Sequence, residues 1–421
     1  MIKIKQKETA KTENKKTIST QIAIIGGGLA GLACSIRLAR KGIKVVLIEK
    51  NTYPFHKVCG EYISNEALDY VKSLGVNPFD FGAVALDKFW LSSPSGNKLE
   101  LDLPLGGFGI SRYTLDYELS KIATKEGVQI WEGTFVKDVN KEMGNGNTKE
   151  ELGLGNWELG NESNKLSETN KKRQAENKFL IETSNGNIKS QVVIGSYGKR
   201  SNLDNKLQRD FSSKNFPYIG VKYHLKTDLM PNNVIALHNF WRGYCGISRI
   251  EDDKFCFCYL SHKDNITDFK KVENIEKQLF TENPFLSKIL KEAEFLYDKP
   301  EIINQVSFSP KKLIEDDILM CGDSAGMITP LCGNGMAMAL HSSKILSDLL
   351  ISHFDNQINF NTLKTDYQKH WNSQFQLRLK AGRTVQHFFG GRQSSELLIN
   401  TFKYIPSVAR KVVSLTHGKV F

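Results

Sequence analysis

Three glycines, Gly26, Gly28 and Gly31, are spaced as G-x-G-x-x-G, a pattern that binds a phosphate when it links a strand to a helix. The first glycine permits a tight turn, the second lets the phosphate approach the backbone, and the third lets the helix pack on the strand. Glu49 follows the next apolar run, where a carboxylate can accept hydrogen bonds from both ribose hydroxyls. Together these residues predict binding of an ADP-containing dinucleotide.

The elements that position these residues can be read from the same stretch. Residues 22–25 and 45–48 are short apolar runs, as expected for strands buried on both faces. Between them, residues 29–39 carry apolar side chains at helical spacing, and Gly42 follows the helix. The free N–H groups and dipole of that helix create an anion site at its start.

A second glycine-rich stretch follows another apolar run, at residues 318–321. It begins with Gly322 and Asp323 and continues through Pro330, Gly333 and Gly335 into a predicted helix over 336–351. An aspartate that leaves a strand beside a glycine can accept a hydrogen bond from a polyol hydroxyl. The turn that opens the helix directs N–H groups at nearby negative charge.

The remaining pattern predicts two further structural regions. Alternating residues from 218 to 260, with frequent turns, predict antiparallel strands, and two more strands are expected near 83–91 and 98–103. Helices are expected over 64–74, 269–281, 284–295 and most of 362–416, and another should begin near residue 115.

Composition narrows the function classes. The chain has 421 residues and a formal charge of +11, and the excess lies entirely in residues 1–20 and 351–421. A nucleic-acid enzyme would more often place its cations in the body of the chain, so we expect no nucleic-acid partner.

The seven cysteines show no zinc spacing, and no window approaches the ~20 apolar residues needed to cross a bilayer. We expect no bound metal and a cytoplasmic location, with an anionic inner-membrane surface as an alternative contact for the basic ends.

These patterns predict a division of the chain. We expect a disordered basic tail at 1–20, a discontinuous dinucleotide-binding domain, a substrate domain, and a C-terminal helical region at 353–421. The dinucleotide-binding domain takes 21–82, 108–215 and 309–352, with a flexible polar insertion at 140–178, and the substrate domain takes 83–107 and 216–308.

The two glycine-rich motifs together resemble the FAD-binding pair of the para-hydroxybenzoate-hydroxylase-like superfamily. The resemblance implies an α/β fold: a Rossmann-like FAD-binding domain of the GR2 type, an antiparallel substrate sheet and C-terminal helices. It implies that Asp323 holds the ribityl chain and that the helix at Gly335 points at the pyrimidine side of the flavin.

Within that superfamily the chain most resembles the geranylgeranyl-reductase family. The run 53–61, which contains Cys59-Gly60, resembles that family's loop beside the flavin, and 112–116 resembles its R-x-x-[LF]-D helix start. Three departures stand out: Tyr197 replaces the aspartate of the central G-A-D-G-x-x-S motif, Glu61 follows Cys59-Gly60 where a second glycine is usual, and the run 243–248 lacks the family's Trp and Phe-Pro.

The resemblance and the motifs give a set of expected FAD-binding residues. They are Gly26, Gly28, Leu29, Ala30, Gly31, Glu49, Lys50, Arg112, Gly322, Asp323, Pro330, Gly333 and Gly335. His56 and Lys57 could also neutralise the pyrophosphate, although a solvated loop is the alternative interpretation.

Three residues are candidates for catalysis. Cys59 could donate a proton or gate the substrate, or be a packed thiol; Glu61 could be an acid or base, or cap a helix; Tyr244 could line the substrate cavity, or be a core tyrosine. We predict an FAD-dependent oxidoreductase that reduces C=C bonds of a lipophilic, isoprenoid or polyketide-like substrate.

Two other functions stay open. One is an FAD-dependent monooxygenase that hydroxylates an aromatic compound or a polyketide, and the other is a membrane-docked flavoprotein electron carrier. No second G-x-G-x-x-G unit is found for a nicotinamide cofactor, so electrons are expected from transiently docked NAD(P)H or from an electron-donor protein. The basic, apolar run from Leu397 to Val413 predicts either an interfacial helix that admits a lipophilic substrate or a helix packed on the substrate domain.

Overall fold

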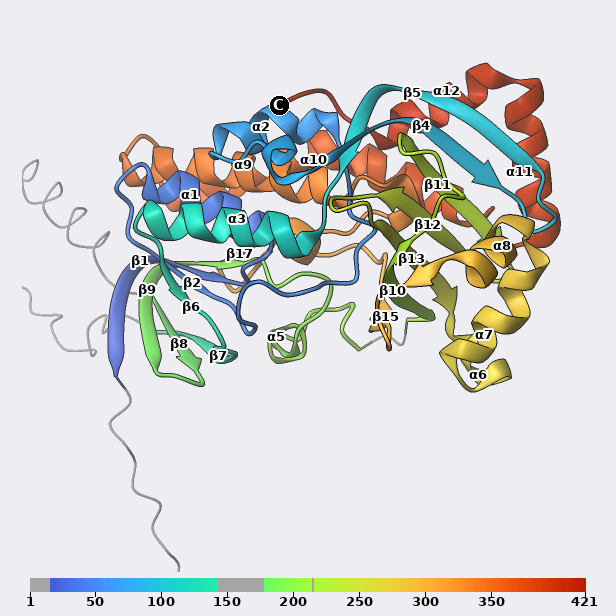
Figure 1. The fold of residues 1–421 in the computed structure, drawn as a ribbon. Coiled ribbons are helices and arrows are strands. Elements are labelled where there is room, and N and C mark those ends of the chain that lie inside the picture. Colours follow the sequence, from blue (N-terminus) through green and yellow to red (C-terminus); the bar gives the residue numbers. More distant parts are fainter. Residues whose placement is uncertain (1–15, 143–177, 214–215) are drawn as a thin grey trace, which may run out of the picture.

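The structure is a computed structural model that describes residues 16–142, 178–213 and 216–421 (Figure 1). Most of the predicted tail and of the predicted insertion lies outside these ranges. The tail was expected to extend to residue 20, and this is wrong at its end. Strand β1 begins at Thr17, because residues 17–20 pair in parallel with residues 187–190 of β9.

The first sheet is mainly parallel and has the strand order β16-β17-β9-β1-β2-β6, with β8 added beside β9 and β7 beside β8. Its motifs follow the carboxyl ends of strands that lie side by side, which is where open α/β sheets bind ligands. The strands are β1 (Thr17–Ile25), β2 (Val45–Ile48), β6 (Gln129–Trp131), β7 (Val136–Lys141), β8 (Phe179–Thr183), β9 (Asn187–Gly195), β16 (Ile314–Glu315) and β17 (Ile318–Met320).

Three helices lie together along one side of this sheet (Figure 1). They are α1 (Leu29–Ala39), α3 (Arg112–Lys125) and α9 (Gly335–Phe354). Helices α1 and α9 each begin directly after a glycine-rich motif. The N-termini of these two helices therefore lie at the same edge of the sheet.

The second sheet is largely antiparallel and has the strand order β14-β10-β13-β12-β11-β4-β5-β3, with β15 paired to β10. Strand β3 lies inside the segment 21–82 that was assigned to the dinucleotide-binding domain, yet it pairs with β5 of this sheet. The strands are β3 (Tyr62–Ser64), β4 (Val84–Ser92), β5 (Lys98–Gly109), β10 (Tyr218–Lys226), β11 (Val234–Phe240), β12 (Gly243–Arg249), β13 (Phe255–His262), β14 (Glu294–Phe295) and β15 (Glu301–Val306).

Of the remaining helices, α6 to α8 flank the second sheet, α10 to α12 follow α9, and α5 contacts β7 of the first sheet. The predicted single helix at 269–281 is wrong in its limits, because Lys270 has a φ of +65° and separates two helices. These helices are α2 (Leu68–Ser73), α5 (Asn202–Lys206), α6 (Lys263–Phe269), α7 (Val272–Leu279), α8 (Pro284–Glu292), α10 (Phe360–Gln386), α11 (Arg392–Tyr404) and α12 (Pro406–Thr416). Among the described residues, no helix combines the length and apolar composition needed to cross a membrane.

A substitution at Gly31 tests how closely helix α1 packs on strand β1. A Cβ built at Gly31 would lie 2.1 Å from the carbonyl oxygen of Gly26, closer than real Cβ contacts. We predict that Gly31→Ala lowers the free energy of unfolding by about 1–3 kcal/mol, because the helix must move away from the strand. Urea unfolding measures this. Gly60→Ala is the control, because its Cβ would meet nothing within 4 Å, and equal stability of the two variants would contradict this account of the packing.

Candidate functional site

A cavity of about 950 Å³ is lined by residues of both sheets and of the C-terminal helices. Its volume is near the upper end of the ~300–1,000 Å³ typical of small-molecule sites. All the expected FAD-binding residues except Gly31 line it, as do Cys59, Glu61 and Tyr244. Gly31 is instead packed against the backbone of Gly26, which is the role expected for the third glycine.

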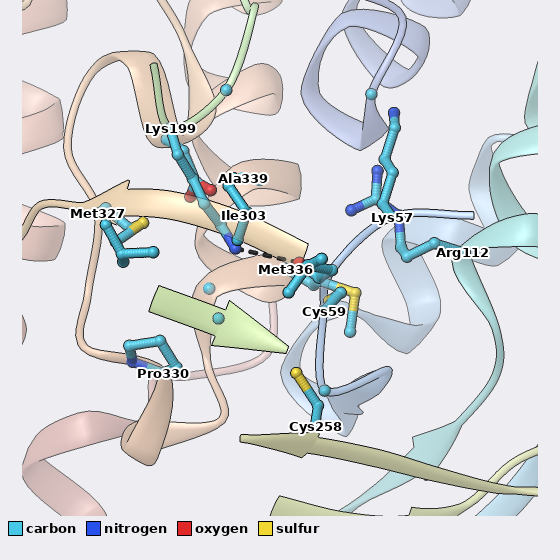
Figure 2. A pocket seen from close by; sticks show the side chains of 18 of the residues that line it. Lys57, Cys59, Arg112, Lys199, Cys258, Ile303, Met327, Pro330, Met336 and Ala339 are labelled. Atoms are coloured by element: carbon cyan, nitrogen blue, oxygen red, sulfur yellow. Dashed lines mark hydrogen bonds between the residues drawn. The ribbon is translucent and has the colours of Figure 1, made fainter. Parts of the chain in front are cut away.

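Positive charge gathers at the start of α1. Measured from a Cβ built on Gly28, the residue before the helix, the guanidinium Nη2 of Arg112 lies 3.5 Å away and the ammonium of Lys57 lies 3.6 Å away. Figure 2 shows the two side chains together at one end of the pocket. The two cations, one carboxylate beside them and the helix N-terminus leave a net attraction for an anion.

The carboxylate beside these cations is Asp116, which fixes their positions. Arg112 donates from Nε and Nη2 to its two oxygens at 2.7 and 2.6 Å, and Lys57 donates to Oδ2 at 3.0 Å. Burial alone would raise the pKa of Asp116, but Arg112 and Lys57 outweigh burial and lower it. Asp116 is therefore ionised and holds both cations beside the turn.

Glu49 lies at the end of β2 and is buried, with 5% of its surface exposed. Its Oε2 accepts from the Gly27 amide at 2.8 Å, and its Oε1 accepts from the Asn51 amide at 3.0 Å. The carboxylate is thus fixed beside the glycine turn and lines the cavity. This is the arrangement expected of an acid that meets a ribose.

The second motif surrounds another part of the cavity. Gly322 and Gly333 have φ values of +64° and +63°, a conformation that favours glycine, and both line the cavity together with Asp323. Helix α9 begins two residues after Gly333, so its N-terminus faces the same space. Asn334 is fixed between them, because its Nδ2 donates to the carbonyl of Thr416 at 2.7 Å.

These features fit FAD. The cationic turn suits a pyrophosphate, Glu49 suits a ribose, Asp323 suits a polyol, and the N-terminus of α9 suits the electron-rich side of a flavin ring. A Cβ at Gly28 would meet only the ends of the Arg112 and Lys57 side chains within 4 Å, so the turn leaves room for a phosphate beside both cations.

Glu61 has a different environment from the one expected for an acid–base catalyst. It is fully buried, and its Oε1 accepts from the ammonium of Lys222 at 2.5 Å while its Oε2 lies 2.6 Å from Nε2 of His224. Burial would raise the pKa of Glu61, but Lys222 and His224 outweigh it and lower the pKa to about 2. An ionised carboxylate at neutral pH has no proton to donate, so the geometry favours a structural role.

That structural role joins three elements. Glu61 also accepts from the backbone amide of Arg112, the first residue of α3, at 2.9 Å. Lys222 and His224 lie on β10, so one carboxylate connects the Cys59 loop, the start of α3 and the second sheet. Sequence reasoning missed both β10 residues; the available signal was two ionisable side chains two positions apart, which share a face of a strand.

The chain of polar side chains continues beyond Glu61. Nδ1 of His224 lies 2.9 Å from the hydroxyl of Tyr297, which lies 3.1 Å from Nδ1 of His56. Cys256 completes a group with Glu61 and His224 whose candidate metal-ligand atoms lie within 4.8 Å of one another. The ammonium of Lys222 already occupies one oxygen of Glu61, so this group does not suit a metal cation.

Cys59 lies in the loop between β2 and β3, partly buried and facing the cavity. Two backbone contacts fix this loop: Lys199 donates to the carbonyl of Val58 at 3.1 Å, and the thiol of Cys256 donates to the carbonyl of Cys59 at 3.2 Å. Figure 2 shows Cys59 and Cys258 extending into the pocket from the loop and from β13. Burial raises the pKa of the Cys258 thiol to about 12, so Cys258 is neutral.

Tyr244 lies on β12, with 3% of its surface exposed, and its ring meets that of Phe389 edge-on at 5.6 Å. Burial raises the pKa of its hydroxyl well above the usual value, and the backbone of Leu331 opposes that rise. No side chain of the described residues hydrogen-bonds to the hydroxyl, which leaves it able to contact a polar group of a bound molecule.

Tyr197 replaces the aspartate of the central motif, and its hydroxyl bonds to a residue outside that motif. Its hydroxyl donates to Asp204 at 3.1 Å, and Asp204 pairs with the buried Arg209 at 2.9 Å. Arg209 in turn donates to the carbonyl of Ser324 at 3.0 Å. Tyr197, Asp204 and Arg209 therefore form a polar chain that reaches the backbone of the second motif.

The buried pair of Glu61 and Lys222 predicts that the stability of the protein falls in acid. The native pKa of Glu61 lies below its ordinary value, so its contribution to stability is complete above about pH 4.5 and is lost as the pH falls toward 2. We predict that Glu61→Gln costs about 3–5 kcal/mol near pH 7, because Lys222 stays buried without a counter-charge, and that the cost shrinks below pH 4.

Chemical denaturation across this pH range measures the effect. Asp102→Asn is the matched control, because the Lys88–Asp102 pair is exposed and should change stability by less than about 1 kcal/mol. If Glu61→Gln and Asp102→Asn lose equal stability, Glu61 does not join the Cys59 loop to α3 and β10 as inferred.

Part of this site lies in a segment that matches a known family. Residues 19–227 match the family described as FAD binding domain. The chain is 26% identical to conditioned medium factor receptor 1 of Dictyostelium discoideum, over 87% of this chain and 70% of that protein. It is 22% identical to digeranylgeranylglycerophospholipid reductase of Methanococcus vannielii, over 84% of this chain and 82% of that protein.

Solved structures share the fold at low identity. The flavin-dependent brominase Bmp2 superposes with a TM-score of 0.71 at 17% identity, over 94% of this chain and 93% of that chain. PqsL of Pseudomonas aeruginosa, a probable FAD-dependent monooxygenase, gives a TM-score of 0.68 at 13% identity, over 91% of this chain and 100% of that chain. These structures show the fold that the chain shares, and the family match shows an FAD-binding-domain segment at residues 19–227.

Proposed function

We propose that the protein is an FAD-dependent reductase of C=C bonds in a lipophilic, isoprenoid or polyketide-like substrate. The observation that carries this proposal is the cavity wall beyond the FAD-binding motifs. That wall is apolar and comes from the second sheet and the C-terminal helices, with Leu91, Leu237, Phe389, Phe402, Val412 and Val413 among its residues. A long apolar substrate would bury its surface there, at ~25 cal/mol per Å².

FAD that had been reduced by two electrons would supply a hydride to one carbon of the double bond and return to the oxidised form, and a proton must reach the other carbon. The chain's own residues bind, orient and exclude water. The cationic turn at Gly28 holds the cofactor by its phosphates, and the N-terminus of α9 favours negative charge on the nearby ring. The electron donor is proposed to be transiently docked NAD(P)H or an electron-donor protein.

Cys59 is the proposed proton donor. Its side chain faces the cavity, its loop is fixed by Lys199 and Cys256, and the neighbouring carboxylate of Glu61 is occupied by Lys222. Tyr244 is the proposed polar contact of the substrate, because it lines the cavity and its hydroxyl is approached by the Leu331 backbone but hydrogen-bonds to no side chain of the described residues.

Anaerobic reoxidation tests the reaction. We expect chemically reduced holoprotein to return to the oxidised spectrum when it is mixed, without oxygen, with a polyprenyl alkene, and to give the saturated product in equal amount. Reoxidation is followed by visible absorbance and product by mass spectrometry. Reduced protein that stays reduced across isoprenoid and polyketide-like alkenes would contradict the proposal.

Substitution of Cys59 tests the proton donor. We expect Cys59→Ala to slow turnover by about 10²–10⁴-fold while FAD binding is retained, because general acids contribute that much. Cys59→Ser should recover part of the rate, and the solvent deuterium isotope effect should change. Cys258→Ala is the comparison, since it removes a thiol from the facing wall; equal losses in both variants would remove the assignment from Cys59.

A monooxygenase is the second candidate, and the fold likeness to PqsL favours it. The same experiment separates the two functions. Substrate-dependent oxygen consumption with an oxygenated product, and no reaction without oxygen, would replace the reductase by the monooxygenase.

A further inference from the structure

The corner between α11 and α12 exposes large apolar side chains. Tyr404 is 86% exposed, Ile405 48% and Val408 38%, and Leu397, near the middle of α11, is 63% exposed. Figure 1 shows the two helices (red) on the side of the molecule away from the first sheet, beside β4 and β5. Apolar groups of this size gathered at one corner commonly mark a contact site.

The charge around this corner is mainly positive. Residues 397–421 contain Lys403, Arg410, Lys411 and Lys419 and no acidic residue, although Glu396 directly precedes them. All four cations are exposed; Lys403 donates to Asn97 and interacts with the Glu396 carboxylate, whereas the other three form no ion pair with the described residues. Exposed apolar side chains beside unpaired cations match the interface of an anionic bilayer, where each basic residue near the surface adds ~1 kcal/mol of attraction.

The opposite faces of the same helices form the cavity wall. Phe402 of α11 and Val412, Val413 and Thr416 of α12 line the cavity, whereas Tyr404, Ile405 and Val408 face outward. One pair of helices therefore separates the proposed substrate cavity from the exposed corner. A bilayer at this corner would place a lipid-dissolved substrate within two helix diameters of the cavity, ~20–24 Å.

We propose that the α11–α12 corner, defined by Leu397, Tyr404, Ile405, Val408, Arg410 and Lys411, docks the protein on an anionic lipid bilayer from which it takes its substrate. Docking itself rests on the exposed corner and its charge. The substrate route rests on the proposed function.

Vesicle flotation tests docking without any turnover. The full-length, FAD-loaded protein is mixed with phosphatidylcholine vesicles that contain either no or one-third phosphatidylglycerol. We expect binding to the anionic vesicles, weakened by high salt, and little binding to the neutral ones. Arg410→Gln/Lys411→Gln should weaken binding about 30-fold, from about fivefold per charge. Tyr404→Ser/Ile405→Ser should weaken it at least about tenfold.

Two control variants match these changes. Leu377→Ser removes an equally exposed leucine from α10, and Lys41→Gln/Lys125→Gln removes two exposed cations elsewhere; both should bind as the wild type does. Circular dichroism and flavin absorbance confirm that the corner variants are folded. Absence of binding to anionic vesicles, or equal loss in the corner and control variants, would overturn the proposal; a soluble protein captured by the corner instead would also overturn it.

The substrate route has its own readout. Turnover of a short alkene dispersed in detergent should be unchanged in the corner variants, whereas turnover of a long-chain substrate embedded in anionic vesicles should fall with vesicle binding. Loss of both activities would contradict the docking role. Absence of alkene reduction by the wild type would refute the proposed function while the flotation result stands.

Discussion

The buried carboxylate of Glu61 is the interaction on which the arrangement of the site depends. It accepts from Lys222 of β10 and from the first amide of α3, and it lies beside His224. Glu61 itself has a φ of +54°, a conformation that is uncommon outside glycine and that surrounding contacts must hold. Together with the contacts that Lys199 and Cys256 make to its backbone, this anchor fixes the Cys59 loop between the two sheets.

From this anchor the cofactor site follows. Arg112 receives its backbone position from Glu61 and its side-chain position from Asp116, and so reaches the glycine turn at the start of α1. Glu61 thus supports the cation expected to meet the pyrophosphate through its backbone amide alone. The Cys59 loop, the start of α3 and strand β10 are joined at this one carboxylate.

The local motifs were predictable from the sequence because each depends on neighbours in the chain. Gly26, Gly28, Glu49, Gly322 and Asp323 line one cavity, and their types and spacing had indicated dinucleotide chemistry. The antiparallel second sheet was equally visible, because its strands alternate and turn often. The resemblance added FAD, and the family match supports it.

Long-range contacts were not predictable in this way. Nothing near Glu61 in the sequence shows that Lys222 will neutralise it, so an acid–base role stood beside a capping role. The first four residues of β1 were assigned to the tail because they are polar, and only their pairing with β9 makes them a strand. The domain limits stay predictions. The catalytic assignments also stay predictions, because they depend on where the cofactor and the substrate bind.

We infer that the cavity binds FAD through both of its halves, with the phosphates at Gly28 and the flavin at the start of α9. Equilibrium titration of the cofactor-free protein with FAD, FMN and ADP, followed by visible absorbance and calorimetry, is the decisive measurement. We expect the protein to bind one FAD per chain, to bind FMN much more weakly, and to show competition by ADP that is weakened in Arg112→Met. Failure to bind FAD, or FMN binding as tightly as FAD, would contradict it.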